Sequence, residues 1–198
     1  MGEQTVREDL APTLAEKRLM AGSADGVEWQ DLGAPVVADV DRIVVASDIA
    51  DGAETIAAQP DVPRNITGTL TDANDSVTST VTIRGLDIAG RIIEEVMEIA
   101  AGVGKVFTGT KIFATVTSVV VSGTSGNAAG DTLSIGVGNV IGLPKTINNV
   151  QAVKHVWFNG APVTPDAIAV GTSKSGVDVN GATYDGSKVL KVAYYPGW

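Results

Sequence analysis

The sequence predicts an all-β protein, an antiparallel β-sandwich or a jelly-roll-like barrel, with an N-terminal arm that contains at most a short helix. Short segments rich in Val, Ile and Thr are separated by turn residues about every 8 to 12 positions, a spacing typical of such folds. No helical pattern of useful length follows residue 35. We therefore expect an arm over residues 1–34, a main β domain over 35–148, and a C-terminal lobe of strands over 149–198 that packs on or beside the main domain.

A helix-start signal lies in the predicted arm. Thr13 is placed to cap a helix, and Glu16, three residues later, completes a capping box. Four apolar side chains form a stripe on this segment: Leu10, Leu14, Leu19 and Met20. Glycines follow from residue 22, so the helix is short, and an isolated helix below about 12 residues is marginal in water. The segment is either an arm ordered by docking on a partner or a frayed terminus without a role.

Strand patterns fill the predicted main domain. Residues 78–83 alternate, with valine and isoleucine facing one side and threonines the other, the signature of a half-buried strand. Residues 72–75 predict a turn, because short Asx side chains hydrogen-bond their own backbone. Residues 91–101 fit a strand or a helix, since their glutamates favour helix. The β-branched run 111–121 predicts a central or interface-facing strand.

The predicted lobe contains strand segments, two hairpin signals and most of the aromatic residues. The strands span residues 150–158, 167–170, 177–179 and 189–194. Asn159-Gly160 and Asp185-Gly186 are the hairpin signals, because these residue types tolerate positive φ. The aromatic tail 194–198 is either docked on the lobe or exposed as a contact. The candidate partner contacts are Leu10, Leu14, Leu19, Met20, Trp29, Tyr194, Tyr195 and Trp198.

Composition and charge exclude several classes of protein. The chain has 198 residues, no Cys, one His and a net charge of −9, so a disulfide scaffold and a Cys-ligated zinc site are excluded. Neither a nucleic-acid nor a membrane partner is expected, because the chain is acidic and lacks an apolar run of about 18 residues. Residues 1–100 carry −12 and residues 101–198 carry +3. This polarity either orients the protein against a partner or is mixed by folding.

Motifs that carry chemistry are scarce, and we expect neither an enzyme nor a cofactor. His155, the only histidine, lies in a strand pattern without a nucleophile elbow elsewhere in the chain. The glycine-rich segments 102–105 and 136–142 lack the spacing of phosphate-binding loops. Oxygen ligands for calcium could come from the 72–75 turn, with Asp87 at the next corner; the alternative is a plain Asx turn. The turn residues concerned are Asp72, Asn74 and Asp75.

Five segments are similar to segments that recur in structural proteins of tailed bacteriophages. They are AAQPDVPRNIT (57–67), TVTIRGLDIAG (80–90), GTKIFATVTSV (109–119), AGDTLSIGVG (129–138) and GLP (142–144). Within that group the chain resembles capsid decoration, or cement, proteins. The resemblance covers roughly residues 57–144 and implies a β-rich, non-enzymatic particle component without catalytic residues to transfer.

The functional expectation follows from this resemblance together with the apolar, weakly charged composition. We expect a protein that binds the outside of the major capsid protein lattice, as a homotrimer, on virions assembled in the cytoplasm of a bacterial host. A neck, tail or spike component is the alternative. A third possibility, an enzyme of the particle that degrades envelope polysaccharide, would depend on Asp72 or Asp87.

Overall fold

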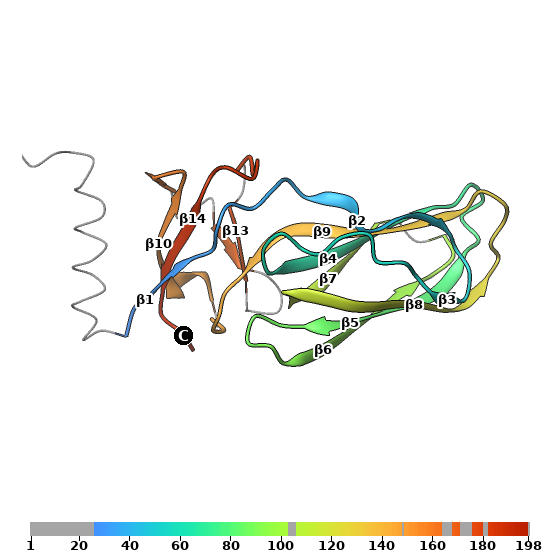
Figure 1. Ribbon diagram of the computed structural model, residues 1–198, viewed down its shortest axis with the longest axis horizontal. Helices are drawn as coiled ribbons and strands as arrows, with labels where there is room; N and C mark the ends of the chain where they lie inside the picture. Colours follow the sequence, from blue (N-terminus) through green and yellow to red (C-terminus); the bar gives the residue numbers. More distant parts are fainter. Residues whose placement is uncertain are drawn as a thin grey trace, which may run out of the picture.

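The computed structural model describes residues 26–102, 106–147, 149–163, 168–170, 176–179 and 182–197. These residues form an elongated all-β molecule, with a β-sandwich at one end and a smaller lobe at the other (Figure 1). Each part has its own cluster of buried apolar side chains. The predicted all-β fold is confirmed, and its architecture is a sandwich of antiparallel sheets.

Two antiparallel sheets form the sandwich. In the first, β9 lies between β4 and β2, and β7 lies beside β4 at the edge. The second has the order β3-β8-β5-β6. The strands of the first are β2 (Asp39–Asp48), β4 (Arg64–Thr71), β7 (Val106–Phe113) and β9 (Thr132–Gly142). Those of the second are β3 (Gly52–Ala53), β5 (Thr78–Leu86), β6 (Ile92–Ile99) and β8 (Thr115–Ser125).

Alternation along the strands explains the sandwich core. On β5, Val81 and Ile83 are fully buried, whereas the alternating threonines Thr80 and Thr82 are half-buried, as the sequence predicts. β6 occupies most of the ambiguous segment 91–101, so the segment is a strand. Burial of every second residue, including Met97 and Ile99, outweighs the weak helix preference of its glutamates.

Glu95 closes one edge of the sandwich. It lies on β6 with 8% of its surface exposed, and its carboxylate accepts hydrogen bonds from the Thr110 amide (2.6 Å), the Thr110 hydroxyl (3.0 Å) and the Lys111 amide (3.2 Å). Gly109 provides the space, because a Cβ there would lie 2.4 Å from Glu95 Oε2. The carboxylate thus occupies donors that an edge strand would otherwise offer to another chain.

The lobe is built on a third sheet, ordered β1-β14-β10-β11. Its strands are β1 (Glu28–Asp31), β10 (Val153–Phe158), β11 (Ala161–Pro162) and β14 (Leu190–Tyr194), and the short helix η1 (Val150–Ala152) precedes β10. β1 falls within the predicted arm 1–34, yet it pairs with β14 along its whole length. The described part of that segment therefore belongs to the lobe sheet, because its partner strand lies more than 150 residues away and leaves no local signal.

One of the two predicted hairpins is confirmed. β10 and β11 are joined at Asn159 and Gly160, which adopt φ of 53° and 75°. The Asp185-Gly186 hairpin is wrong, because β14 pairs with β1 and β10 rather than with a strand just before the turn. The Asp185 carboxylate instead accepts the amides of Ser187 and Lys188, which makes a local Asx turn.

β9 joins the sandwich to the lobe. Its first part pairs with β2 and β4, and its last residues pair with β13 (Gly176–Val179), which in turn pairs with β12 (Ile168–Val170). Ile141 near its end belongs to the lobe core rather than to the sandwich core. The change from the sandwich core to the lobe core therefore takes place within β9, several residues before the predicted domain boundary at residue 148.

Arg64 lies fully buried at this junction. Its Nε donates to the Gly138 carbonyl (2.7 Å), and its Nη1 donates to the Val36 carbonyl (3.1 Å) and the Asp61 carboxylate (2.8 Å). Burial opposes ionisation of Asp61, but the Val36 amide and the Arg64 guanidinium outweigh it and lower the pKa of that carboxyl. One guanidinium thus ties β4, β9 and the segment before β2 together.

Candidate partner-binding face

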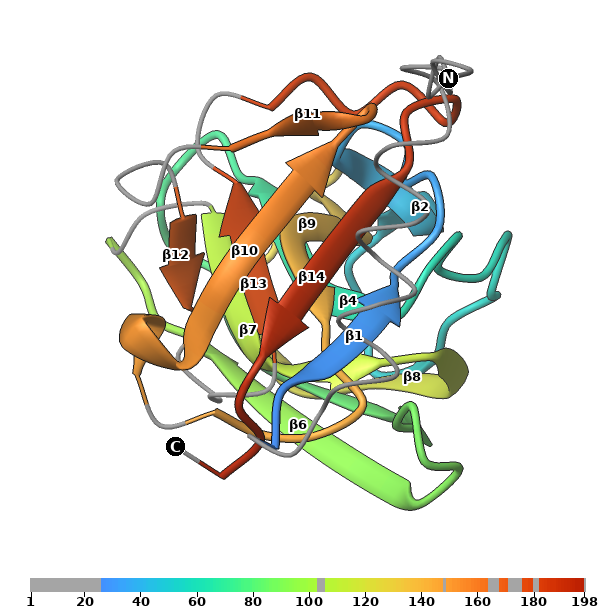
Figure 2. The same cartoon turned by 90° about the vertical axis from the view of Figure 1, so that its left-hand side faces the viewer.

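The outer side of the lobe sheet carries a group of aromatic and cationic side chains, which we call the aromatic face. It consists of Trp29 on β1, His155 and Trp157 on β10, Tyr195 directly after β14, and Lys154. In Figure 2 the three strands β10, β14 and β1 lie side by side toward the viewer. The face points away from the sandwich, at the end of the molecule.

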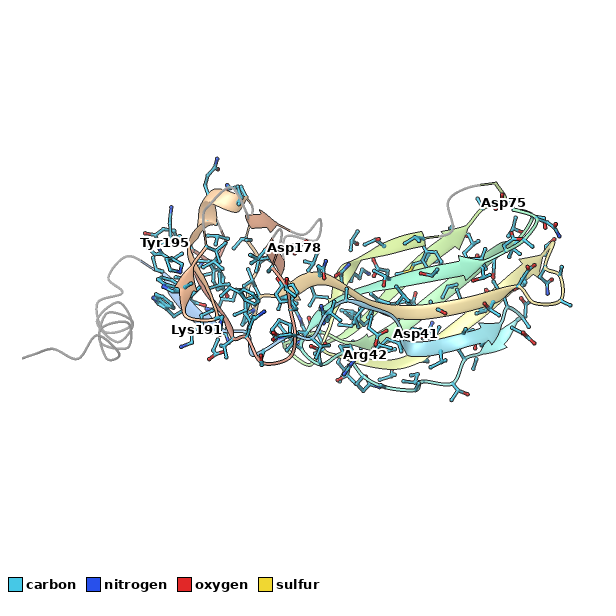
Figure 3. The ribbon with its side chains drawn as sticks, turned by 90° about the horizontal axis from the view of Figure 1, so that it is seen from above. Asp41, Arg42, Asp75, Asp178, Lys191 and Tyr195 are labelled. Carbon is cyan, nitrogen blue, oxygen red and sulfur yellow. The ribbon has the colours of Figure 1, made fainter. Side chains whose placement is uncertain are left out.

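Strand alternation separates this face from the lobe core. Val156 on β10 and Val192 on β14 are buried on the inner side of the sheet, so their neighbours Trp157 and Lys191 point outward. Figure 3 shows Lys191 and Tyr195 on the outer side of the lobe, and Asp178 on the side toward the sandwich. Asp178 is half-buried there, and this burial raises the pKa of its carboxyl.

The rings of the aromatic face contact one another. The centroids of Trp29 and Trp157 lie 4.6 Å apart with an interplanar angle of 34°, and His155 lies 5.2 Å from Trp157. Trp29 is in register with Ala193, and Ala193 is in register with His155. The small alanine leaves space above β14, and the rings from β1 and β10 close over it. Each aromatic pair of this kind contributes about 0.5–1.5 kcal/mol beyond its buried area.

Positive charge accompanies the rings. Lys154 Nζ lies 5.0 Å from the centroid of the Tyr195 ring, within cation–π distance. His155 and Lys154 are exposed, and Trp29, Trp157 and Tyr195 are half-exposed. Trp and Tyr side chains on a partly open surface are typical of the energetically important centre of protein interfaces, whereas a lysine such as Lys154 is typical of the polar rim.

Two of the predicted contact residues lie on this face, and one does not. Trp29 and Tyr195 are both on it, whereas Tyr194 is fully buried in the lobe core and is unavailable to a partner. Burial raises the pKa of the Tyr194 hydroxyl. Tyr194 and Tyr195 are neighbours on an extended strand, so only one of them can face outward. The remaining predicted contacts lie outside the described residues: Leu10, Leu14, Leu19, Met20 and Trp198.

Sequence reasoning overlooked Trp157 and Lys154 as contacts and took His155 for an ordinary strand position. His155 does lie in β10, but on the exposed side and against Trp157. The available signal was the alternation around Val156. With Val156 assigned to the core, His155 and Trp157 must share the opposite face.

In the 72–75 turn, considered above as a source of oxygen ligands for calcium, the buried carboxylate accepts backbone hydrogen bonds. Asp72 is buried, and its carboxylate accepts the amides of Asn74 (3.0 Å) and Val77 (2.9 Å), as in the alternative interpretation of a plain Asx turn. Asp87 follows β5 while Asp72 and Asp75 precede it, so the two sites are separated by the length of that strand, roughly 30 Å. Among the described residues, no group of three or more His, Cys, Asp or Glu side chains is placed to hold a metal ion.

Comparisons with known proteins add no assignment. No family model, no curated protein and no solved structure matches the chain. In the part of the chain that the structure describes, no helix is long and apolar enough to span a membrane.

Proposed function

We propose that this chain is a structural protein of a phage virion, a capsid decoration protein that binds the outside of the major capsid lattice through its aromatic face. The observation that carries the proposal is the aromatic face itself, with two tryptophans, a tyrosine and two basic residues grouped at one end of an elongated molecule. Partner-binding energy is concentrated in Trp, Tyr and Arg side chains at such centres.

The similarity to structural proteins of tailed bacteriophages supports the particle setting. The similar segments, within residues 57–144, lie mainly on β4 to β9, which form most of the sandwich. The aromatic face lies outside those segments, on β1, β10 and the end of β14. We infer that the sandwich provides the framework and that the lobe makes the contact with the capsid lattice.

Stabilisation of the shell would follow from mass action. A protein that binds only the assembled lattice stabilises it by RT ln(1 + [L]/Kd) per site, about 2.7 kcal/mol when its free concentration is 100 times Kd. No catalytic step is required, and each additional copy adds its own increment. Shells that carry the protein should therefore melt at a higher temperature than shells without it.

The number of copies on purified particles tests the proposed location. A decoration protein is expected at hundreds of copies per particle, spread over the capsid surface. A count of a few to a dozen would instead indicate a neck, tail or spike component. Failure to find the protein on particles at all would reject the virion assignment.

Substitution of Trp157 by alanine tests the proposed contact. Loss of a central tryptophan is expected to weaken binding to shells about 30-fold or more, the equivalent of about 2 kcal/mol. Val96→Ala is the matched control, because Val96 is 51% exposed on the outer side of β6 in the sandwich. Equal binding by W157A and V96A would show that the aromatic face is not the contact.

A further inference from the structure

The outer side of the lobe sheet is not covered by any other strand among the described residues. In Figure 2 the strands β10, β14 and β1 lie toward the viewer, and no described strand lies in front of them. Trp29 and Trp157 form the centre of this side, with their ring centroids 4.6 Å apart. Burial of an aromatic side chain removes about 150–250 Å² from water, so a segment that covers these rings stabilises the free chain.

The indole nitrogen of Trp29 is a second feature of this face that calls for a covering segment. Its Nε1 is buried, and none of the described residues accepts a hydrogen bond from it. Buried donors in folded proteins are nearly always paired, because an unpaired one loses its contact with water without compensation. A carbonyl or carboxylate oxygen laid over Trp29 would supply the acceptor.

The chain that precedes β1 is attached directly beside this face. Glu28 at the start of β1 is in register with Tyr194, so β1 begins at the end of the sheet that carries Tyr195. Gly26, two residues before β1, has a φ of 73°, a left-handed conformation in which glycine lets the chain change direction. Residues 1–25 are therefore tethered at one end of the aromatic face.

Within residues 1–25, the stretch 10–20 has the composition of a segment that packs on an apolar surface. It holds Leu10, Leu14, Leu19 and Met20, together with the predicted helix start at residue 13. As a helix, these residues would be about 16 Å long. The five-residue β14 at the centre of the lobe sheet has nearly the same length, roughly 17 Å. A helix this short is marginal in water and needs a surface to pack on.

The tether is long enough for the segment to lie over the whole face. Six steps of the backbone separate residue 20 from Gly26, and they span at most about 20 Å. Neighbouring strands lie about 4.8 Å apart, so the distance across the sheet from β1 through β14 to β10 is about 10 Å. The segment can therefore reach the rings on both outer strands.

Charge and tethering favour this segment over the same face of a second copy. Residues 1–25 hold five acidic and three basic residues, whereas the face holds Lys154 and Lys191 against Asp31. Two such faces packed together would bring their lysines close to each other. A tethered segment has an effective concentration in the millimolar range, far above that of another copy in a micromolar solution.

We propose that residues 10–20 pack on the aromatic face of their own chain. Leu14 and Leu19 contact the two tryptophan rings, and an oxygen of the segment accepts the hydrogen bond of the Trp29 indole. Binding of the capsid lattice to the same face would displace the segment, and this consequence rests on the proposed function. The contact itself requires only the purified chain.

Paramagnetic broadening in the full chain tests the contact. The chain has no cysteine, so Glu16→Cys provides a single attachment point for a nitroxide. The indole signals of Trp29 and Trp157 should lose most of their intensity relative to a sample in which the nitroxide is reduced. The amide signals of β3, at the far end of the sandwich in Figure 1, should keep theirs.

Two double variants of the nitroxide-labelled chain show whether apolar packing holds the segment. Leu14→Asp with Leu19→Asp should restore the indole signals, because carboxylates are not buried against apolar rings without a partner. Gln4→Asp with Thr5→Asp is the matched control, since it adds the same two charges outside residues 10–20 and should leave the broadening unchanged. Should L14D/L19D fail to fold, L14S/L19S carries the same test.

Three results would overturn the proposal. The first is equal indole intensities in the nitroxide and reduced samples. The second is broadening that L14D/L19D leaves unchanged. The third is broadening only between chains, seen when a nitroxide-labelled chain is mixed with an isotope-labelled chain that carries no nitroxide, which would assign the segment to a second copy. None of these results changes the copy number on particles, which tests the proposed function separately.

Discussion

Replacement of Arg64 by alanine is expected to lower the free energy of unfolding by about 3–5 kcal/mol. The side chain is fully buried and makes three hydrogen bonds at the junction of the two cores. Its removal leaves the half-buried Asp61 carboxylate without its cation and takes away the hydrogen bonds that Arg64 donates to the Gly138 and Val36 carbonyls. The loss would be about a third to a half of the free energy of unfolding of a domain that is stable by about 10 kcal/mol.

Urea denaturation of R64A and three companion variants measures this effect. Arg84→Ala is the control, because Arg84 pairs with Glu94 at a surface where its side chain is 62% exposed, and such pairs contribute about 0–1 kcal/mol. Asp61→Asn and the double variant R64A/D61N complete a double-mutant cycle. The double variant should lose less than the sum of the single variants, because no charge is left buried alone.

The pH dependence of the free energy of unfolding is a second, independent test of the Arg64–Asp61 pair. The pKa of Asp61 is lower in the folded chain than in the unfolded chain, so the pair stabilises the fold above about pH 4 and this contribution is lost as the pH falls through the folded pKa. D61N should lack that part of the acid dependence. A loss below about 1 kcal/mol in R64A, or strictly additive effects in the cycle, would refute the reasoning.

Three further predictions concern other parts of the fold. Glu95→Ala should lower the free energy of unfolding by about 1–3 kcal/mol, because the Thr110 amide and hydroxyl lose their acceptor. The variant should also scatter more light on storage, because these donors lie on an edge strand that can then pair with another chain. Unchanged scattering would count against a role of Glu95 in protecting that edge. Gly136→Ala should lower the free energy of unfolding by about 3 kcal/mol or more in thermal melts. The new Cβ would meet the backbone of Asp39, which cannot move aside as a side chain could. A neutral effect would contradict this close approach of β2 to β9. Burial raises the pKa of Tyr184 to about 12, so its neutral hydroxyl stabilises the fold below pH 10 and this contribution declines as the pH rises toward 12. Tyr184→Phe should therefore flatten the decline of the free energy of unfolding over this pH range. An identical decline in the variant would contradict the role of Tyr184.

Local patterns predicted local structure well. The alternation of residues 78–83 gave a strand with the correct inner face, and Asn159-Gly160 gave the observed turn. Both depend on neighbouring residues alone. The Asp185 turn shows the limit, because turn chemistry was correctly inferred there while the strand pairing, which depends on distant residues, was not.

The candidate face needed non-local information. Trp29 and Trp157 are 128 positions apart and meet only because β1 and β10 both pair with β14. The clustering of aromatic residues near the C-terminus pointed to the lobe. It could not show that Tyr194 faces the core and Tyr195 faces outward, because that depends on the register of β14 in the lobe sheet. The Arg64 contacts were equally invisible, because two of its three acceptors are backbone carbonyls, which carry no sequence signature.

The passage of β9 through both cores has a mechanical consequence. A load applied to the lobe is transmitted into the sandwich along β9, which is hydrogen-bonded to β4 on one side and to β2 on the other, and along the segment that joins β1 to β2. A pull along the strand axis strains these bonds together rather than one after another. The end of the molecule that carries the aromatic face is therefore attached to the sandwich through a continuous strand that is paired along most of its length.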